Sequence, residues 1–173
     1  MSRILTLDLG TKTGWAVGEE TGTWALMSAK EVTAQHKLRF DRRLDARIPR
    51  LYDHIVKAHG ASPLDWIVFE DVLFASTTMQ AHLWASLRAT VWLAGHNLRV
   101  NVECLNTASL KLFATGHGGA TKDMMAAWLV KKHSDEFYLE AGTVKKVNTD
   151  EALDDNAVDA AHLLFWAQRT LKV

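Results

Sequence analysis

The chain has 173 residues, a length that suits one compact domain burying about two-thirds of the surface that its unfolded form exposes. Hydrophobic residues make up 48% and charged residues 23% of the composition, which excludes an extended disordered protein. Twenty basic residues balance twenty acidic ones, so net charge gives no argument for a polyanionic partner. Any nucleic-acid binding therefore has to come from local patches.

The first predicted elements along the chain are strands. Residues 3–9 form an apolar run that contains Asp8, and the turn GTKTG leads into a second apolar stretch at 15–17, which predicts a hairpin. Residues 23–32 are a candidate third strand. A polar stretch rich in Arg and His follows at about 35–47.

Helices and strands then alternate. Apolar residues at helical spacing predict a helix over 45–59, and the short run WIVFE, which ends in Glu70, is typical of a buried strand. A helix over 79–96, closed by Gly95, precedes a strand over 98–105. The remaining predicted elements are all helices, over 107–115, 122–133 and 151–171. This order indicates an α/β fold with one mixed sheet and helices on both faces.

Neither a targeting segment nor a membrane partner is expected. The start MSRILTLDLG lacks the apolar stretch of a signal peptide, and no run approaches the roughly 20 apolar residues that span a bilayer. Cys104 is the single cysteine, so no intramolecular disulfide can form, and its surroundings favour a buried, reduced thiol. These features favour the cytoplasm, of a bacterial or phage-infected cell.

Four carboxylates stand at positions that suit a site. Asp8 and Glu70 lie at the carboxyl-terminal side of strand runs, where open α/β sheets border the ligand crevice. Asp155 and Asp159 are four residues apart, so on a helix they share one face and repel each other unless a cation lies between them. Taken singly, each is equally consistent with a solvated strand end or an acidic first helical turn. Taken together, they suit hard divalent cations, and two such ions can promote phosphodiester hydrolysis.

The segments ILTLDLGTKTGWAV, WIVFEDVLF, SLKLFATGHGGATK and DDNAVDAAHLL resemble, in this order, the conserved blocks of RuvC-type Holliday-junction resolvases. They span nearly the whole chain. The resemblance implies an RNase H-like fold with a five-stranded sheet, a homodimer, Mg²⁺ or Mn²⁺ with two ions per site, and paired symmetric nicks across a four-way DNA junction. On this basis residues 1–173 form a single nuclease domain.

The resemblance also implies roles for individual residues. Asp8 matches the metal ligand of the first strand, Glu70 the second ligand, and Asp159 the aspartate that precedes alanine on the last helix. Lys111 and Lys122 match basic residues near the scissile phosphate, where an ammonium neutralises developing charge.

The sequence departs from the family pattern on the last helix. A carboxylate or histidine commonly lies three residues before the position of Asp159, and Asn156 stands there in this chain. Asp155 is the nearest substitute and lies one helical turn before Asp159, so its carboxylate can face the metal. Asn156 could instead coordinate through its amide oxygen.

Further DNA contacts are expected after the strand that ends in Glu70 and in the basic stretch that precedes it. Leu73 stands where the family has an aromatic wedge residue, and Phe74 beside it keeps a wedge possible. Arg88 resembles a position that approaches DNA, although it could equally pair with a surface carboxylate. A cationic stretch offers phosphate contacts or simply a solvated helix face: Lys37, Arg39, Arg42, Arg43, Arg47 and Arg50.

Three other functions stay open. YqgF-like nucleases, which process ribosomal RNA precursors, begin with a similar block, but the block from Lys111 to Lys122 favours the resolvases. The DLGTKTG turn also resembles a phosphate-binding turn of actin-like ATPases, which need two such domains around the nucleotide. A DNA-binding module without catalysis is the third, and the presence of Asp8, Glu70 and Asp159 speaks against it.

Overall fold

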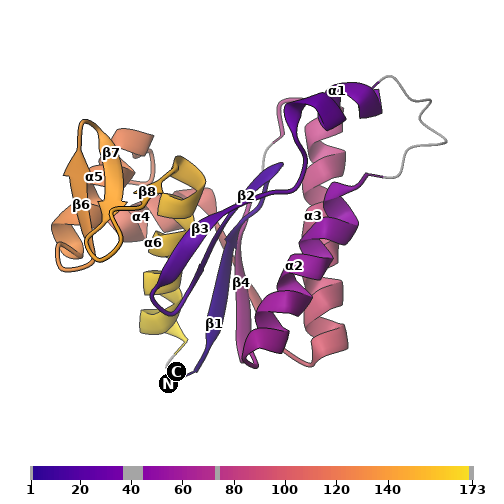
Figure 1. Ribbon diagram of the computed structural model, residues 1–173, viewed down its shortest axis with the longest axis horizontal. Helices are drawn as coiled ribbons and strands as arrows, with labels where there is room; N and C mark the ends of the chain where they lie inside the picture. The colour runs from indigo at the N-terminus through magenta and orange to yellow at the C-terminus, as the bar shows by residue number, and fades with distance from the viewer. Residues whose placement is uncertain (1, 37–44, 73–74, 172–173) are drawn as a thin grey trace.

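A mixed five-stranded sheet forms the centre of the protein in a computed structural model that describes residues 2–36, 45–72 and 75–171 (Figure 1). The strand order is β3-β2-β1-β4-β5, with β1 antiparallel to β2 and parallel to β4. The strands are β1 (Ile4–Asp8), β2 (Lys12–Val17), β3 (Glu20–Ala25), β4 (Trp66–Asp71) and β5 (Asn101–Asn106). The predicted five-stranded α/β arrangement is confirmed.

Helices cover both faces of this sheet (Figure 1). They are α1 (Ala29–His36), α2 (Arg47–Ala61), α3 (Thr78–Leu98), α4 (Thr107–Thr115), α5 (Lys122–Lys132) and α6 (Asp155–Thr170). Side chains alternate between the faces along β1, so Leu5 and Leu7 pack in the cluster under α2 and α3, while Ile4 packs in the cluster around α6. With apolar packing on both faces, β1 and β4 are the nearly continuous apolar runs that the sequence contains.

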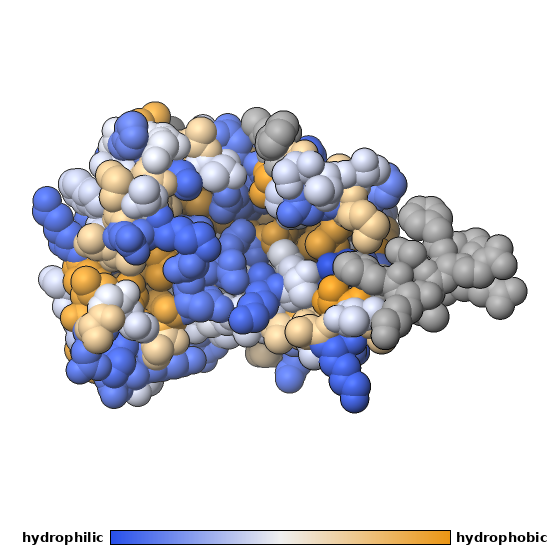
Figure 2. Space-filling model, turned by 90° about the horizontal axis from the view of Figure 1, so that it is seen from above, coloured by the Kyte–Doolittle hydropathy of each residue, from blue (hydrophilic) through white to orange (hydrophobic). Residues whose placement is uncertain are grey.

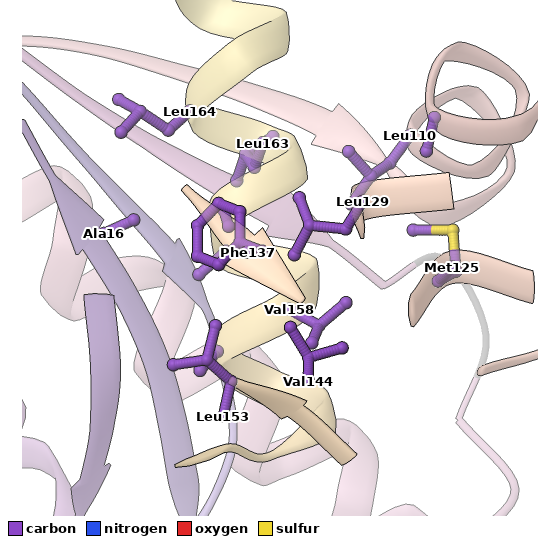
Figure 3. Packing of buried hydrophobic residues seen from close by; sticks show 14 of the residues in the cluster. Ala16, Leu110, Met125, Leu129, Phe137, Val144, Leu153, Val158, Leu163 and Leu164 are labelled. Atoms are coloured by element: carbon purple, nitrogen blue, oxygen red, sulfur yellow. The ribbon is translucent and has the colours of Figure 1, made fainter. Parts of the chain in front are cut away.

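A second, three-stranded sheet was not predicted. It consists of β6 (Phe137–Glu140), β7 (Thr143–Lys146) and β8 (Ala152–Leu153), paired antiparallel. Phe137, Val144 and Leu153 turn inward and join residues of α4, α5 and α6 in one apolar cluster (Figure 3). Each strand has at most four residues and contributes one buried apolar side chain, so no alternation is long enough to mark it in the sequence.

The predicted third strand over 23–32 is wrong beyond its first residues. Strand β3 ends at Ala25, and α1 begins at Ala29. Ser28 and Glu31 form a reciprocal cap, in which the Ser28 backbone N–H donates to Glu31 Oε2 and the Glu31 N–H donates to Ser28 Oγ. This cap starts a helix where the apolar pattern alone suggested continued strand.

No helix in the described part of the chain combines the length and apolar character that a membrane span requires.

Candidate metal centre

Three of the four predicted carboxylates meet at one end of the sheet. Asp8 ends β1 and Glu70 lies near the end of β4; since these strands are parallel, their carboxyl ends share one edge. Asp159 comes from the second turn of α6. One oxygen from each of the three carboxylates lies within 4.8 Å of the other two. Figure 2 views the molecule from above Figure 1 and shows hydrophilic residues gathered in a band between two groups of hydrophobic ones.

The close approach of α6 to the sheet brings Asp159 to Asp8. Gly14, the cross-strand partner of Asp8 in β2, lies directly under the first turn of α6. A Cβ atom at Gly14 would overlap the backbone carbonyl of Asn156, so only glycine lets the helix lie this close. The buried Thr6 hydroxyl donates to the Ala160 carbonyl at 2.7 Å and ties β1 to the residue after Asp159.

Burial and mutual repulsion raise the pKa values of the clustered carboxyls. The pKa of Asp8 is raised well above its ordinary value, first by burial and then by the charges of Glu70 and Asp159. Burial, followed by the charge of Glu70, raises the pKa of Asp159 to about 7. Three carboxylates in this space are therefore unfavourable as free anions, and a cation among them would relieve the repulsion.

Helix α4 presents two groups to Glu70, which is 7% exposed. The Thr107 hydroxyl donates a hydrogen bond to Glu70 Oε1, and the charge of Lys111 acts on the same carboxylate. Burial raises the pKa of Glu70, while the Thr107 hydrogen bond and then Lys111 lower it. Lys111 also lowers the pKa of Asp159, which places its ammonium within electrostatic reach of two of the three carboxylates.

The structure places Asp155 with Lys122 and not with the other three carboxylates. Asp155 Oδ2 lies 2.7 Å from Lys122 Nζ, and both side chains are mostly exposed, at 59% and 70%. Lys122 begins α5, and its charge lowers the pKa values of Asp8 and Asp159. The hydrogen bond that Lys122 donates to Asp155 raises the pKa of Lys122, so this lysine stays charged beside the cluster. Asn156 contributes its backbone to the contact with Gly14.

The remaining predicted DNA contacts have different outcomes. Arg88 lies on α3 and pairs with Asp71, the residue after Glu70, at 3.1 Å between Nη1 and Oδ2. This pairing is the alternative that the sequence left open. Leu73 and Phe74 lie outside the described residues, as do the basic residues between 37 and 43. Arg47 and Arg50 of the same cationic stretch form ion pairs with Asp45 and Glu31.

The donor set of the cluster fits a hard divalent cation. All three side chains offer carboxylate oxygens, the ligands that Mg²⁺ and Mn²⁺ prefer. The positive charges of Lys111 and Lys122 both lower the pKa of Asp159 and so act on the cluster together. Such an arrangement can bind a phosphate between a cation and two ammonium groups, which is the charge pattern of a phosphoryl-transfer site.

Three residues that shape the site were missed by sequence reasoning. Gly14 and Thr6 lie inside strand runs, and Thr107 begins a helix, so each has an ordinary local explanation. For Thr107 a signal was available, because it precedes Lys111 by four residues and so shares its helix face. For the other two, the contact partners on α6 are more than 140 residues away in the sequence, and no local pattern reports such contacts.

Comparison with known proteins identifies the fold. A search of protein-family models finds no match, and a search of curated proteins finds none either. Among solved structures, Thermus thermophilus RuvC in complex with a Holliday junction substrate is similar at a TM-score of 0.64 and 16% identity, over 98% of this chain and 96% of that chain. A second structure of Thermus thermophilus RuvC gives a TM-score of 0.62 and 16% identity, over 96% and 95% of the two chains.

The yeast mitochondrial Holliday junction resolvase Ydc2 is similar at a TM-score of 0.56 and 14% identity, over 94% of this chain and 75% of that chain. At these identities the likeness establishes the fold. The chain therefore has the α/β RNase H-like fold that the sequence predicted.

Proposed function

We propose that this protein is a divalent-metal-dependent endonuclease that cuts branched DNA, with the four-way junction as its preferred substrate. The observation that carries the proposal is the buried cluster of Asp8, Glu70 and Asp159, flanked by Lys111 and Lys122, on a RuvC-like fold. Thermus thermophilus RuvC was solved with a Holliday junction substrate, which supports the same substrate class here.

Asp8, Glu70 and Asp159 would hold Mg²⁺ or Mn²⁺, two ions in our proposal, which supply charge stabilisation and a lowered pKa for the attacking water. The chain's own groups orient the phosphodiester. Lys111 and Lys122 neutralise charge on the phosphate oxygens as it develops. Asp155 keeps Lys122 directed along the edge of the cluster through their ion pair, or enters the metal site itself when DNA binds.

Cleavage of both strands of a junction needs two sites, so we propose that residues 1–173 act as one nuclease domain in a homodimer. Leu87 and Val91 of α3 are buried in the apolar cluster against the sheet, so this face of the helix is not available to a partner. Trp92 and Leu93 on the same helix are 43% and 55% exposed, and we place the dimer contact there.

A cleavage assay over a panel of substrates tests this function. The panel contains a four-way junction, a fork, a flap, linear duplex, single-stranded DNA and structured RNA, each with Mg²⁺, Mn²⁺ or EDTA. We expect metal-dependent cleavage of the four-way junction faster than of linear duplex, with two nicks at symmetric positions.

Other outcomes separate the alternatives. Cleavage of RNA alone would favour the YqgF-like function, and ATP binding without nuclease activity would favour the actin-like one. Junction nicks without symmetric pairing would contradict the homodimer. No cleavage of any substrate with metal present would contradict the whole proposal.

A further inference from the structure

Glu70 is the least solvent-exposed residue of the carboxylate cluster, and a neighbour from another element contacts its side chain. Thr107 Oγ1 donates to Glu70 Oε1 at 2.5 Å. Among the described residues, Thr107 is the only one that donates a hydrogen bond to the Glu70 side chain. A buried glutamate has three side-chain torsions to fix, and a single directed donor restricts the plane of its carboxylate.

The position of the Thr107 hydroxyl is itself fixed by the fold. Strands β4 and β5 are parallel, with Glu70 opposite Leu105 and Asp71 opposite Asn106. Asn106 then caps α4, because its Oδ1 accepts from the Ser109 backbone N–H at 2.9 Å. Thr107, the first residue of the helix, is therefore held beside Glu70 by the register of the sheet and by the cap.

Thr107 lies on the face of α4 that also carries Lys111, four residues later. Its hydroxyl restricts the direction of the Glu70 carboxylate through the hydrogen bond to Oε1. A carboxylate held by such a partner is already oriented when a divalent cation binds.

We propose that Thr107 is a positioning residue, whose hydroxyl holds the Glu70 carboxylate in the orientation that receives the divalent cation. The inference rests on the cation site of the proposed function and is independent of which nucleic acid is cut. Hydrogen-bonding partners of ligating carboxylates typically contribute about 10- to 100-fold to metal affinity. Thr107 thus has a role toward the metal without touching it.

Direct Mn²⁺ binding to the whole protein without DNA, measured by titration calorimetry at pH 8, tests this role. Thr107→Ala and Thr107→Val remove the hydroxyl, while Thr107→Ser keeps it. We expect the first two to weaken Mn²⁺ binding about 10-fold or more and Thr107→Ser to bind within about threefold of wild type. Thr90→Val is the matched control, since Thr90 is a buried threonine whose hydroxyl donates to Ser86 on α3.

Wild-type Mn²⁺ affinity in Thr107→Ala or Thr107→Val would overturn the proposal, and so would an equal loss in Thr107→Ser. The Ala and Ser variants keep the comparison available if the Val variant does not fold. In cleavage assays at saturating Mn²⁺, we expect Thr107→Ala to lower kcat with little change in KM for DNA. Wild-type protein that binds Mn²⁺ more tightly than Thr107→Ala but cuts no substrate would contradict the proposed function and still support the role of Thr107.

Discussion

At the scale of single residues, burial and nearby charges determine the pKa values of the carboxyls in the candidate site. Burial raises the pKa values of all three clustered carboxyls, and the charges of neighbouring carboxylates raise those of Asp8 and Asp159 further; the two lysines offset only part of this effect. Without a cation, the folded state therefore carries an electrostatic cost that the unfolded chain lacks. A group whose pKa is raised by folding binds more protons in the folded state, so stability falls as pH rises through the window between the two pKa values.

Asp159→Asn is expected to stabilise the metal-free protein at high pH. The folded-state pKa of about 7 against an ordinary 3.8 corresponds to an upper limit of about 4 kcal/mol, which is lost as pH rises from about 4 to about 7. We expect urea denaturation in EDTA to show the variant more stable than wild type by about 2–4 kcal/mol at pH 8, and by less at pH 5. Added Mn²⁺ should reverse this order, because only the wild type keeps all three carboxylates.

Asp155→Asn is the matched control for this measurement, since Asp155 lies one turn earlier on α6 and is mostly exposed. Its ion pair is of the surface type, worth up to about 1 kcal/mol, so its loss should be small at both pH values. A stability of Asp159→Asn that follows wild type from pH 5 to pH 8 would show that the cluster does not repel as described.

The three clustered carboxylates could be predicted from the sequence, and the residues that only support them were missed. Asp8 and Glu70 interrupt apolar runs, so their carboxylates stand out as costly unless they serve a purpose. A threonine is an ordinary first residue of a helix, and the contact of Thr107 with Glu70 is visible only in three dimensions. The partner of Asp155 was also beyond the sequence, because Lys122 lies on a different helix, 33 residues earlier.

At the scale of elements, the packing of α6 on the β1–β2 hairpin determines where Asp159 lies. Two contacts fix the position of α6. The backbone of Asn156 packs directly on Gly14, and the Thr6 hydroxyl donates a hydrogen bond to the Ala160 carbonyl. The first positions the amino-terminal turn, and the second positions the turn that carries Asp159. A displacement of α6 would separate the carboxylate of Asp159 from those of Asp8 and Glu70.

Gly14→Ala should displace α6 and weaken both the fold and the metal site. The added methyl group would meet the carbonyl of Asn156, and overpacking of this kind costs about 1–3 kcal/mol. We expect a lower unfolding temperature and weaker Mn²⁺ binding. Gly60→Ala on α2 is the control, because nothing lies within 4 Å of its added methyl group, and alanine in a helix should stabilise by about 0.5–1 kcal/mol. Wild-type stability and Mn²⁺ affinity in Gly14→Ala would refute this account of the helix position.

Elements with a long apolar pattern were predicted from the sequence, and short ones were not. Four of the five main strands and helices α2 to α6 each carry enough regular spacing to be found within a few residues at their ends, whereas β3 was expected to continue into the residues that form α1. Strands β6 to β8 are stabilised by packing Phe137, Val144 and Leu153 into the apolar cluster shared with α4, α5 and α6. A tight turn at Ala141 and Gly142, whose φ angles are 48° and 82°, joins β6 to β7. These strands depend on tertiary packing, and each is too short to show an alternating apolar pattern in the sequence.

At the scale of the whole molecule, two apolar cores meet along the central sheet, and the site lies at the end of the strands between them. One core lies under α2 and α3, and the other surrounds α6 and includes the small sheet. Each core orients part of the cluster, since β1 and β4 belong to both while α6 belongs to the second. The fold thus sets the carboxyl ends of a buried parallel pair of strands beside the helix that carries Asp159.

The most direct test of the central claim compares Asp8→Asn with wild type on a four-way junction, measuring binding and cleavage separately. Loss of one carboxylate ligand removes several kcal/mol of charge stabilisation, so we predict that cleavage in Mg²⁺ falls about 1000-fold or more. Junction affinity in EDTA should stay at the wild-type value, because phosphate contacts do not depend on this side chain. Cleavage by Asp8→Asn at the wild-type rate would contradict the claim that this carboxylate cluster is the catalytic centre.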